Sequence, residues 1–382
     1  MKKVGRVLVN ASILSKQLNG VSVYTIEVLK KLINHFQTDK IDFTIYSYDV
    51  EHLEFIPQIN VEYIRLPAIL EKIFCKKRSL HRILWNWLVL KKIALGYDVV
   101  YSPSTHGFFA GTSQQVITIH DLICLNYPRQ NKMQYFYFKY LVPKIIKKSK
   151  VIAISNFTRH EVLTKYNISD NQISTIYNGA DHFYNRQSQQ VNKSSEVFGF
   201  NLKTEKYFLT VGANYPHKNI MMLLEVANSL KGSGYKFVIV GCNGSYRVAV
   251  EKAIQEKLLT NIILMPYVSN DELSSLYEYS IANIYISLLE GFGFPPIEAS
   301  FYKKISFVAN TSCMPEIYGD SVIYVDPYNL MDILEKITLF INGDIDQEKY
   351  SSHLKKLKLM YEWRKTADSI FDLIINTLNE QN

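Results

Sequence analysis

Short apolar runs alternate with amphipathic segments along the whole chain. Stretches with apolar residues three and four positions apart predict helices, among them 21–34 and 156–165. The runs between them, rich in β-branched and aromatic residues, predict strands. In the first half these strands are 6–9, 43–46, 61–66, 99–101, 116–119, 151–154 and 173–176. The second half restarts with 207–211, 237–240, 262–265, 283–286, 305–308 and 322–325. This alternation predicts parallel sheets covered by helices, an α/β fold.

The two series of strands predict two doubly wound, Rossmann-like domains, and 382 residues suffice for both cores. A polar stretch over 186–196, with Gln-Ser-Gln-Gln and Lys-Ser-Ser, is typical of a linker. We therefore expect an N-terminal domain over 1–185, a C-terminal domain over 197–360 and a last helix over 361–378. Doubly wound sheets bind ligands at the carboxyl ends of their strands, so a ligand is expected in a central cleft that the domains face.

Charge is spread unevenly over the chain. The net charge is +8, yet residues 1–180 hold 24 Lys and Arg against 12 Asp and Glu, and the remainder holds 19 against 23. An anionic partner is therefore expected for the first half. The four Cys are dispersed without metal-ligand spacing, the N-terminus does not read as a signal peptide, and no apolar run is long enough to span a bilayer. A reduced, cytoplasmic setting is expected.

Two acid-free basic segments carry much of this charge. Residues 72–92 contain Lys76, Lys77, Arg78 and Arg82 beside Trp85 and Trp87, and residues 133–150 combine five Tyr and Phe with four Lys after position 143. Such segments suit an anionic membrane surface, and the first is the better candidate. The alternative is a solvated basic face whose aromatic residues belong to the core. Nucleic acid is not expected, because no RNA-binding motif accompanies the aromatics.

The segment Glu290 to Ser300 reads as strand, glycine-rich loop and helix, with the sequence Glu-Gly-Phe-Gly-Phe-Pro-Pro-Ile-Glu-Ala-Ser. A helix opening at Pro295 or Pro296 would leave backbone N–H groups suited to a phosphate or diphosphate. Glu290 and Glu298 bracket this loop, and carboxylates beside a phosphate accept hydrogen bonds from sugar or ribose hydroxyls. This combination indicates a nucleotide sugar. The alternative for Glu298 is an ordinary acid in a first helical turn.

Lys218 follows the strand 207–211 and precedes a helix expected near Asn219, which places an ammonium group at a strand end. There it can meet phosphate as a point charge. The alternative is a surface lysine, although a cation at a helix N-terminus opposes the helix dipole. Its neighbour His217 is expected to be only partly charged at neutral pH.

Taken in order, these motifs resemble those of glycosyltransferase family 4, retaining enzymes with the GT-B fold, over nearly the whole chain. The matching segments are Asn19-Gly20-Val21, His120-Asp121-Leu122, Asn178-Gly179-Ala180-Asp181, Pro216-His217-Lys218-Asn219 and Glu290-x7-Glu298 around Gly291-Phe292-Gly293-Phe294. The resemblance implies that the last helix crosses back onto the N-terminal domain. The loop at Gly20 lacks a Gly-x-Gly-x-x-Gly pattern, which argues against a dinucleotide oxidoreductase.

The resemblance assigns roles to individual residues. Lys218, Glu290 and His120 are the expected catalytic group. The nucleotide sugar is expected to contact Gly20, His217, Lys218, Tyr267, Val268, Glu290, Gly291, Phe292, Gly293, Phe294 and Glu298. In this group Glu298 would bind the ribose and Glu290 would bind the transferred sugar. Tyr267-Val268 would contact the edge of the base through backbone groups. Asp121, which would also orient the His120 ring, and His106 are expected on the acceptor side.

The reaction implied is transfer of a hexose from a nucleoside diphosphate sugar to a saccharide acceptor by front-face attack. The donor favoured is GDP-mannose or dTDP-rhamnose, with a UDP-sugar as a further option. A lipid-linked acceptor in surface polysaccharide biosynthesis would place the protein in the cytoplasm, peripherally at the inner face of the membrane. No cofactor or metal is expected, and Asp344-Ile-Asp346 is interpreted as a solvated loop. The alternatives are a GT-B nucleotide-sugar epimerase and a non-catalytic, membrane-docking partner of another transferase.

Overall fold

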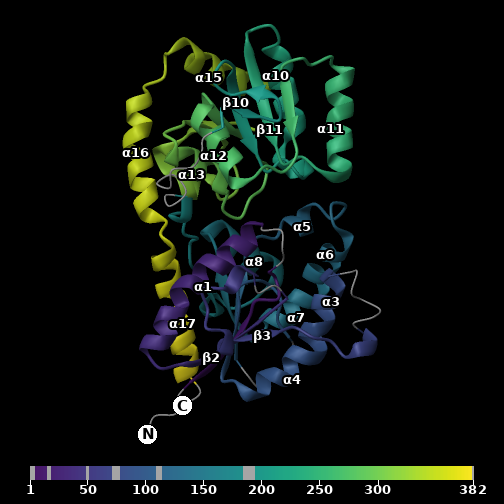
Figure 1. Ribbon diagram of the computed structural model, residues 1–382, viewed down its shortest axis with the longest axis vertical. Helices are drawn as coiled ribbons and strands as arrows, with labels where there is room; N and C mark the ends of the chain where they lie inside the picture. The colour runs from purple at the N-terminus through teal and green to yellow at the C-terminus, as the bar shows by residue number, and fades with distance from the viewer. Residues whose placement is uncertain are drawn as a thin grey trace. The chain divides into compact units, whose positions relative to one another are not determined.

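The computed structural model describes residues 5–14, 19–48, 51–70, 78–108, 114–183 and 194–380. The chain divides into two compact units, which are described separately (Figure 1). Unit 1 comprises Met1–Gly179 and Glu362–Asn382, and unit 2 comprises Ala180–Tyr361.

The described part of unit 1 is built on a seven-stranded parallel sheet in the order β3-β2-β1-β4-β5-β6-β7. The strands are β1 (Arg6–Asn10), β2 (Asp42–Ser47), β3 (Val61–Tyr63), β4 (Val99–Ser102), β5 (Gln114–Ile119), β6 (Ser149–Ala153) and β7 (Ile173–Thr175). The strand order reverses between β1 and β4, so the carboxyl ends of these two strands form the crevice where doubly wound sheets bind ligands. Asn10 ends β1 there, and its Nδ2 donates to Ser102 Oγ (3.2 Å) at the end of β4.

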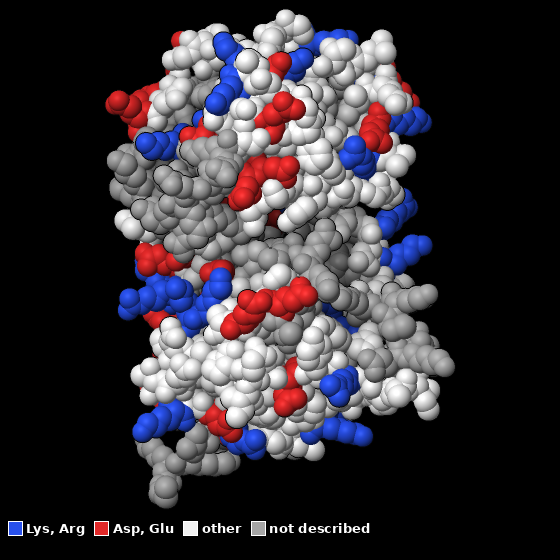
Figure 2. Space-filling view, in the orientation of Figure 1, with Lys and Arg blue, Asp and Glu red and all other residues white. Residues whose placement is uncertain are grey.

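Helices cover the faces of this sheet. They are α1 (Gly20–Thr38), α3 (Arg78–Trp85), the π-helical η3 (Asn86–Leu90), α4 (Lys91–Ile93), α5 (Ile123–Asn126), α6 (Lys132–Phe136), the π-helical η5 (Tyr137–Leu141), α7 (Val142–Ile146) and α8 (Asn156–Tyr166). Within the described ranges, no helix is long and apolar enough to cross a membrane. On the face drawn in Figure 2, basic and acidic side chains are interspersed over unit 1, so its positive charge is not gathered into one patch there.

The last helix, α17 (Trp363–Asn379), belongs to unit 1 and lies alongside α1 (Figure 1). His35 on α1 contacts Asp368 on α17 through Nε2 and Oδ1 (2.8 Å), and its ring stacks on Phe371. At the start of α17, Trp363 packs directly on Gly179. A Cβ atom at position 179 would lie 2.2 Å from the Trp363 nitrogen, which accounts for a glycine at this point.

The described part of unit 2 has a six-stranded parallel sheet in the order β12-β11-β10-β13-β14-β15. Its strands are β10 (Lys206–Val211), β11 (Tyr235–Val240), β12 (Ile262–Met265), β13 (Ala282–Tyr285), β14 (Ser306–Ala309) and β15 (Ile323–Val325). Its helices are α10 (Ile220–Ser229), α11 (Gly244–Glu256), α12 (Asn270–Tyr279), α13 (Phe294–Phe301), α14 (Met314–Tyr318), α15 (Leu330–Asn342) and α16 (Gln347–Met360). Here the strand order reverses between β10 and β13, which again marks a ligand crevice at their carboxyl ends.

The parallel strands and their covering helices confirm the predicted fold class, but the junction between the units differs from the expected one. Residues 186–193 of the expected linker lie outside the described ranges. The strands β8 (Glu196–Val197) and β9 (Phe200–Asn201), which follow, pair as a hairpin in unit 2. Unit 2 already begins at Ala180, because the Ala180 N–H donates to Tyr361 O (2.8 Å) and the Phe183 ring packs against Phe294 and Phe301.

Candidate active site

Two segments meet at the strand-order reversal of unit 2: the 3₁₀ turn η7 (Pro216–Lys218), which follows β10, and the loop after β13. The carbonyl of His217 accepts a hydrogen bond from the Leu288 N–H (2.7 Å), and Ser287 Oγ lies 3.1 Å from the same carbonyl. These contacts fix the turn against the loop. As a result, Lys218 and Glu290, which the sequence predicted separately at two strand ends, come into direct contact.

Lys218 Nζ forms an ion pair with Glu290 Oε1 and also donates to Tyr285 OH (3.1 Å). Ser287 Oγ donates to the same glutamate oxygen (2.7 Å), and the Glu290 N–H donates to Ser312 Oγ (3.2 Å). Burial disfavours the charge of Glu290, but Lys218, His217 and Ser287 outweigh burial and hold its pKa below the ordinary value. The site therefore contains a fixed cation and a fixed carboxylate.

His217 is buried, with 4% of its surface exposed, and its ring stacks on Tyr215 at a centroid distance of 5.7 Å. Burial lowers the pKa of His217 to about 4; Glu290 opposes this shift and Lys218 adds to it. The ring is consequently neutral at pH 7, instead of partly charged as the sequence indicated. Lys218 is then the residue of this turn that carries positive charge.

The glycine-rich loop leads into α13, which begins at Phe294, one residue before the expected start. Gly293 precedes the helix with φ +80°, a left-handed conformation that favours glycine, and its carbonyl accepts a hydrogen bond from Tyr318 OH. Pro295 and Pro296 have no N–H, so the first turn of α13 offers fewer backbone donors than expected. The segment Gly291–Gly293 is buried.

Glu298 lies one turn into α13 and is partly exposed. Tyr277 OH, from α12, donates to Glu298 Oε2 (2.8 Å) and orients the carboxylate. Beyond β12, Tyr267 is 56% exposed and Val268 is buried in the core. Val268 can therefore meet a ligand only through its backbone, and its place beside a base stays a prediction.

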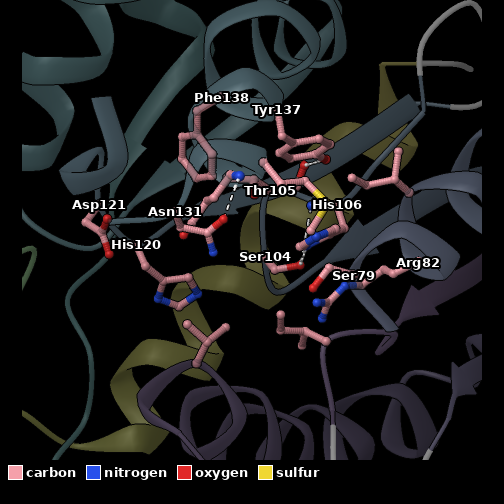
Figure 3. Close-up of a pocket in the computed structure, with 15 residues that line it drawn as sticks. Ser79, Arg82, Ser104, Thr105, His106, His120, Asp121, Asn131, Tyr137 and Phe138 are labelled. Atoms are coloured by element: carbon pink, nitrogen blue, oxygen red, sulfur yellow. Dashed lines mark hydrogen bonds between the residues drawn. The ribbon is translucent and has the colours of Figure 1, made fainter. Parts of the chain in front are cut away.

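Unit 1 contains a pocket of about 210 Å³ at the carboxyl ends of β4 and β5 (Figure 3). Most of the residues that line it lie at strand ends or on flanking helices. They are Ser104, Thr105 and His106 after β4, His120 and Asp121 after β5, and Ser79, Arg82, Ile83, Met133, Gln134, Tyr137 and Phe138 from α3, α6 and η5, with Ile13, Val21 and Asn131 completing the lining. The pocket thus brings together the predicted residues His106, His120 and Asp121.

The His120 ring is held by a hydrogen bond from Nε2 to the Pro103 carbonyl (2.9 Å) and by edge-to-face packing on Tyr24. Since a carbonyl only accepts, Nε2 carries the proton and Nδ1 is left as an acceptor. Burial lowers the pKa of His120 to about 4, although the Pro103 bond opposes the shift. Asp121 Oδ1 accepts from the Ile123 N–H (2.9 Å) at the start of α5. That Asp121 also orients the His120 ring stays a prediction.

His106 lines the same pocket. It shares a hydrogen bond through Nδ1 with Ser104 Oγ (3.1 Å), and its ring stacks on Tyr137 at 5.3 Å. Asn10 Nδ2 donates to its carbonyl (2.6 Å), which ties the loop after β4 to the end of β1. Burial, followed by the nearby Arg82, holds the pKa of His106 well below its ordinary value, so this ring is neutral too.

Gly20 is the exposed first residue of α1, and its neighbour Val21 lines the pocket. A Cβ atom at position 20 would have no described atom within 4 Å, so unit 1 itself gives no packing reason for a glycine.

The sequence did not identify Arg82, Tyr137 and Asn10 as residues of this site. A signal was available for Arg82, because the spacing of Ser79, Arg82 and Ile83 places all three on one face of a helix.

Two family models match consecutive parts of the chain: Glycosyltransferase Family 4 over residues 18–182 and Glycosyl transferases group 1 over residues 191–357. The chain belongs to the group 1 glycosyltransferases of the family 4 type and has the GT-B fold, which confirms the resemblance found in the sequence.

Individual relatives agree with this family. The chain is 28% identical to the O-antigen chain mannosyltransferase RfbU of Salmonella typhimurium, over 84% of this chain and 86% of the relative. It is 22% identical to the O-antigen chain mannosyltransferase B of Escherichia coli, over 86% and 88%.

Solved structures support the fold. A glycosyltransferase from Rickettsia africae superposes with a TM-score of 0.68 at 17% identity, covering 98% of this chain and 99% of that one. Anabaena HepE, solved in complex with UDP-glucose, superposes with a TM-score of 0.65 at 14% identity, covering 98% and 99%.

Proposed function

We propose that this protein transfers a hexose, with mannose favoured, from a nucleoside diphosphate sugar to a saccharide acceptor in surface polysaccharide biosynthesis. The observation that carries the proposal is the Lys218–Glu290 pair at the strand-order reversal of unit 2, with Glu298 one turn into the adjacent helix. Mannose is favoured because two relatives, aligned over 84% and 86% of this chain, are mannosyltransferases of the O-antigen chain. GDP-mannose is therefore the preferred donor, ahead of dTDP-rhamnose or a UDP-sugar.

In this mechanism each residue of unit 2 has a distinct task. Lys218 neutralises the charge that grows on the departing diphosphate, an interaction that is strongest in the transition state. Glu290 accepts hydrogen bonds from hydroxyls of the transferred sugar, and Glu298 accepts them from the ribose. In the pocket of unit 1, His120 can accept a hydrogen bond from a sugar hydroxyl through Nδ1, because its neutral ring keeps that nitrogen unprotonated.

The bond changes follow front-face attack with retention. The acceptor oxygen bonds to the anomeric carbon on the side from which the phosphate oxygen departs, and that phosphate oxygen takes the acceptor proton. No protein carboxylate is assigned as a nucleophile, because Glu290 is engaged by Lys218 and Ser287. We propose that the reaction needs neither metal nor cofactor. The presence of Lys218, Glu290 and Glu298 favours a transferase over a non-catalytic partner. Turnover of a labelled donor distinguishes a transferase from an epimerase.

We also propose a cytoplasmic protein that contacts an anionic membrane surface at its inner face, where a lipid-linked acceptor would be found. The segment 72–92 supports this contact less than its sequence indicated, since Trp85 is buried in the core. Lys76 and Lys77 of this segment lie outside the described residues. Trp87 remains 49% exposed. The second segment gains support, as the following contacts show.

On α6 and η5, Phe136 and Tyr140 are 55% and 52% exposed, and their rings stack at 6.0 Å. The Lys139 ammonium lies 5.4 Å from the Tyr140 ring. Exposed aromatic rings beside lysine are the composition that partitions into an anionic lipid interface. We call these three residues the aromatic face.

A thermal-shift panel of GDP, UDP, dTDP and ADP, each alone and as a sugar conjugate, tests the donor. A ligand that binds only the folded protein raises the melting temperature. We expect GDP and GDP-mannose to give the largest increase, and radiolabelled mannose to appear in a larger saccharide. A larger shift with another base would overturn the donor. Absence of transfer from every donor of the panel to O-antigen acceptors would overturn the function.

A further inference from the structure

We propose that Tyr285 is a positioning residue, which directs the ammonium group of Lys218 toward the diphosphate of the donor. The inference rests on the proposed function in one respect, namely that Lys218 contacts this diphosphate. It adds a residue that the sequence did not identify as part of the site and that acts through Lys218 without touching the donor.

Tyr285 is held at a fixed point at the carboxyl edge of the unit 2 sheet. It is the last residue of β13, it pairs with Val308 of β14, and it is 3% exposed. Its ring packs against the loop that leads into α13, because a Cβ atom at position 293 would lie 3.2 Å from Tyr285 Cε1. A buried ring that is closely packed has little freedom to move. Its hydroxyl is therefore a rigid point against which a flexible side chain can be fixed.

Lys218 contacts this tyrosine in two ways. Its Nζ donates to Tyr285 OH (3.1 Å) and lies 5.3 Å from the centroid of the ring, within the range of a cation–π interaction. Lysine has several rotatable bonds, so an ion pair with Glu290 alone would leave the ammonium group free to follow the carboxylate. The contacts with Tyr285 add a second direction in which the ammonium group is held.

The hydroxyl of Tyr285 keeps its proton at neutral pH. Burial, followed by the charge of Glu290 and a hydrogen bond to that carboxylate, holds the pKa of Tyr285 well above its ordinary value. The oxygen therefore accepts from Lys218 while the proton faces Glu290. An ammonium has three N–H donors, and among the described residues Glu290 and Tyr285 take two of them. The third is left with one fixed direction, for a phosphate oxygen.

Tyr285→Phe removes the hydroxyl and retains the ring with its packing. We expect kcat with GDP-mannose to fall about tenfold, the range for one hydrogen bond to a charged group, and the affinity for GDP in calorimetry to fall by a similar factor. The KM for GDP-mannose should change little, because the interaction with the departing diphosphate is strongest in the transition state. A smaller folded fraction would lower the apparent kcat and the binding stoichiometry but not the affinity for GDP.

Tyr207→Phe is the matched control. Tyr207 is a buried tyrosine on the neighbouring strand β10, and its hydroxyl donates to Leu276 O (2.7 Å). Its substitution removes a buried hydrogen bond from the same sheet and should lower the melting temperature, while kcat and the affinity for GDP stay those of the unmodified protein. Melting temperatures of all variants establish that they are folded.

A double-mutant cycle tests whether Tyr285 acts through Lys218. Lys218→Met removes the group that Tyr285 is proposed to direct, so adding Tyr285→Phe to it should lower neither kcat nor the affinity for GDP any further. A further loss of similar size in this background would show that Tyr285 acts on Glu290 or on the fold, and the inference would be overturned.

The inference is also overturned if the folded Tyr285→Phe variant binds GDP and turns over as the unmodified protein does. Where the donor panel selects another base, the diphosphate and the sugar conjugate of that base replace GDP and GDP-mannose. Absence of binding by every diphosphate of the panel would overturn the proposed function together with this inference. Binding that Tyr285→Phe leaves unchanged would overturn the inference alone, so the two failures are distinguishable.

Discussion

Lys218 and Glu290 form an ion pair although 72 positions separate them in the sequence. Their side chains are only 17% and 10% exposed. Removing one partner from such a pair leaves the other charge buried and unpaired, which costs more than the pair itself contributes. The two residues therefore serve the stability of unit 2 as well as the proposed chemistry, and the two roles can be separated by mutation.

We expect Lys218→Met to lower turnover by about 100-fold or more, by analogy with loss of one preorganised electrostatic group. It should also lower the free energy of unfolding by up to about 3 kcal/mol, because Glu290 keeps its buried charge without its cation. Steady-state kinetics and chemical denaturation measure the two effects. Turnover within a few-fold of the unmodified protein would place the diphosphate site elsewhere.

The double variant Lys218→Met/Glu290→Gln is the control for this prediction. Neutralising both partners should restore most of the lost stability, since the introduced glutamine would bury no charge and Ser287 Oγ could still donate to its amide oxygen. Turnover should remain low. A double variant no more stable than Lys218→Met would show that the pair makes no electrostatic contribution to the fold.

The sequence allowed the strands and most site residues to be predicted, because strand ends and glycine-rich loops have local signals. It did not show that Lys218 and Glu290 are paired, since that requires β10 and β13 to be neighbours while β11 and β12 lie on the far side of β10. The pocket position of Arg82 depends likewise on how α3 packs against α6 and η5. Trp85 could not be assigned to the core from a basic segment that also contains the exposed Trp87.

Glu298→Gln should weaken nucleotide affinity about 10- to 100-fold, which corresponds to the roughly 1.5–3 kcal/mol of hydrogen bonds to a charged group. Tyr277→Phe should weaken it less, because the carboxylate remains but loses the hydroxyl that orients it. Titration calorimetry with the nucleotide found in the donor panel measures both. Unchanged affinity in Glu298→Gln would remove this residue from the ribose site.

Stability should fall as the pH is lowered from 7 to 5, in part through His217. Burial lowers the pKa of His217 to about 4, so below pH 6.5 the unfolded chain binds a proton that the folded chain does not. The loss in free energy of unfolding is on the order of 1–2 kcal/mol at pH 5 and is complete below pH 4. We measure the free energy of unfolding at pH 7 and pH 5 by denaturation. It should change less with pH in His217→Gln than in His160→Gln, the control at an exposed position. Equal dependence in the two variants would contradict a neutral His217.

Transfer activity should survive excess EDTA, since the proposed charge stabilisation comes from Lys218 and not from Mg²⁺ or Mn²⁺ held by carboxylates. The comparison is initial rates with and without chelator after exhaustive dialysis. Loss of activity with EDTA and recovery with either metal would refute the metal-independent mechanism.

The aromatic face should bind anionic vesicles more strongly than the basic segment 72–92 does. Phe136→Ser/Tyr140→Ser should reduce co-sedimentation with phosphatidylglycerol vesicles by about tenfold or more, because two rings no longer enter the interface. Changing Lys76, Lys77 and Arg78 to Ser should have a smaller effect that shrinks further at high salt, where surface charges are screened. Tyr328→Ser is the matched control, since Tyr328 is 68% exposed in unit 2. The opposite result is that the double aromatic variant binds vesicles as well as the unmodified protein, while the variant of Lys76, Lys77 and Arg78 loses binding. That result would show that the segment 72–92, favoured from the sequence, is the membrane contact. If the unmodified protein ignores anionic vesicles, the acceptor must reach the pocket without a membrane contact by this surface.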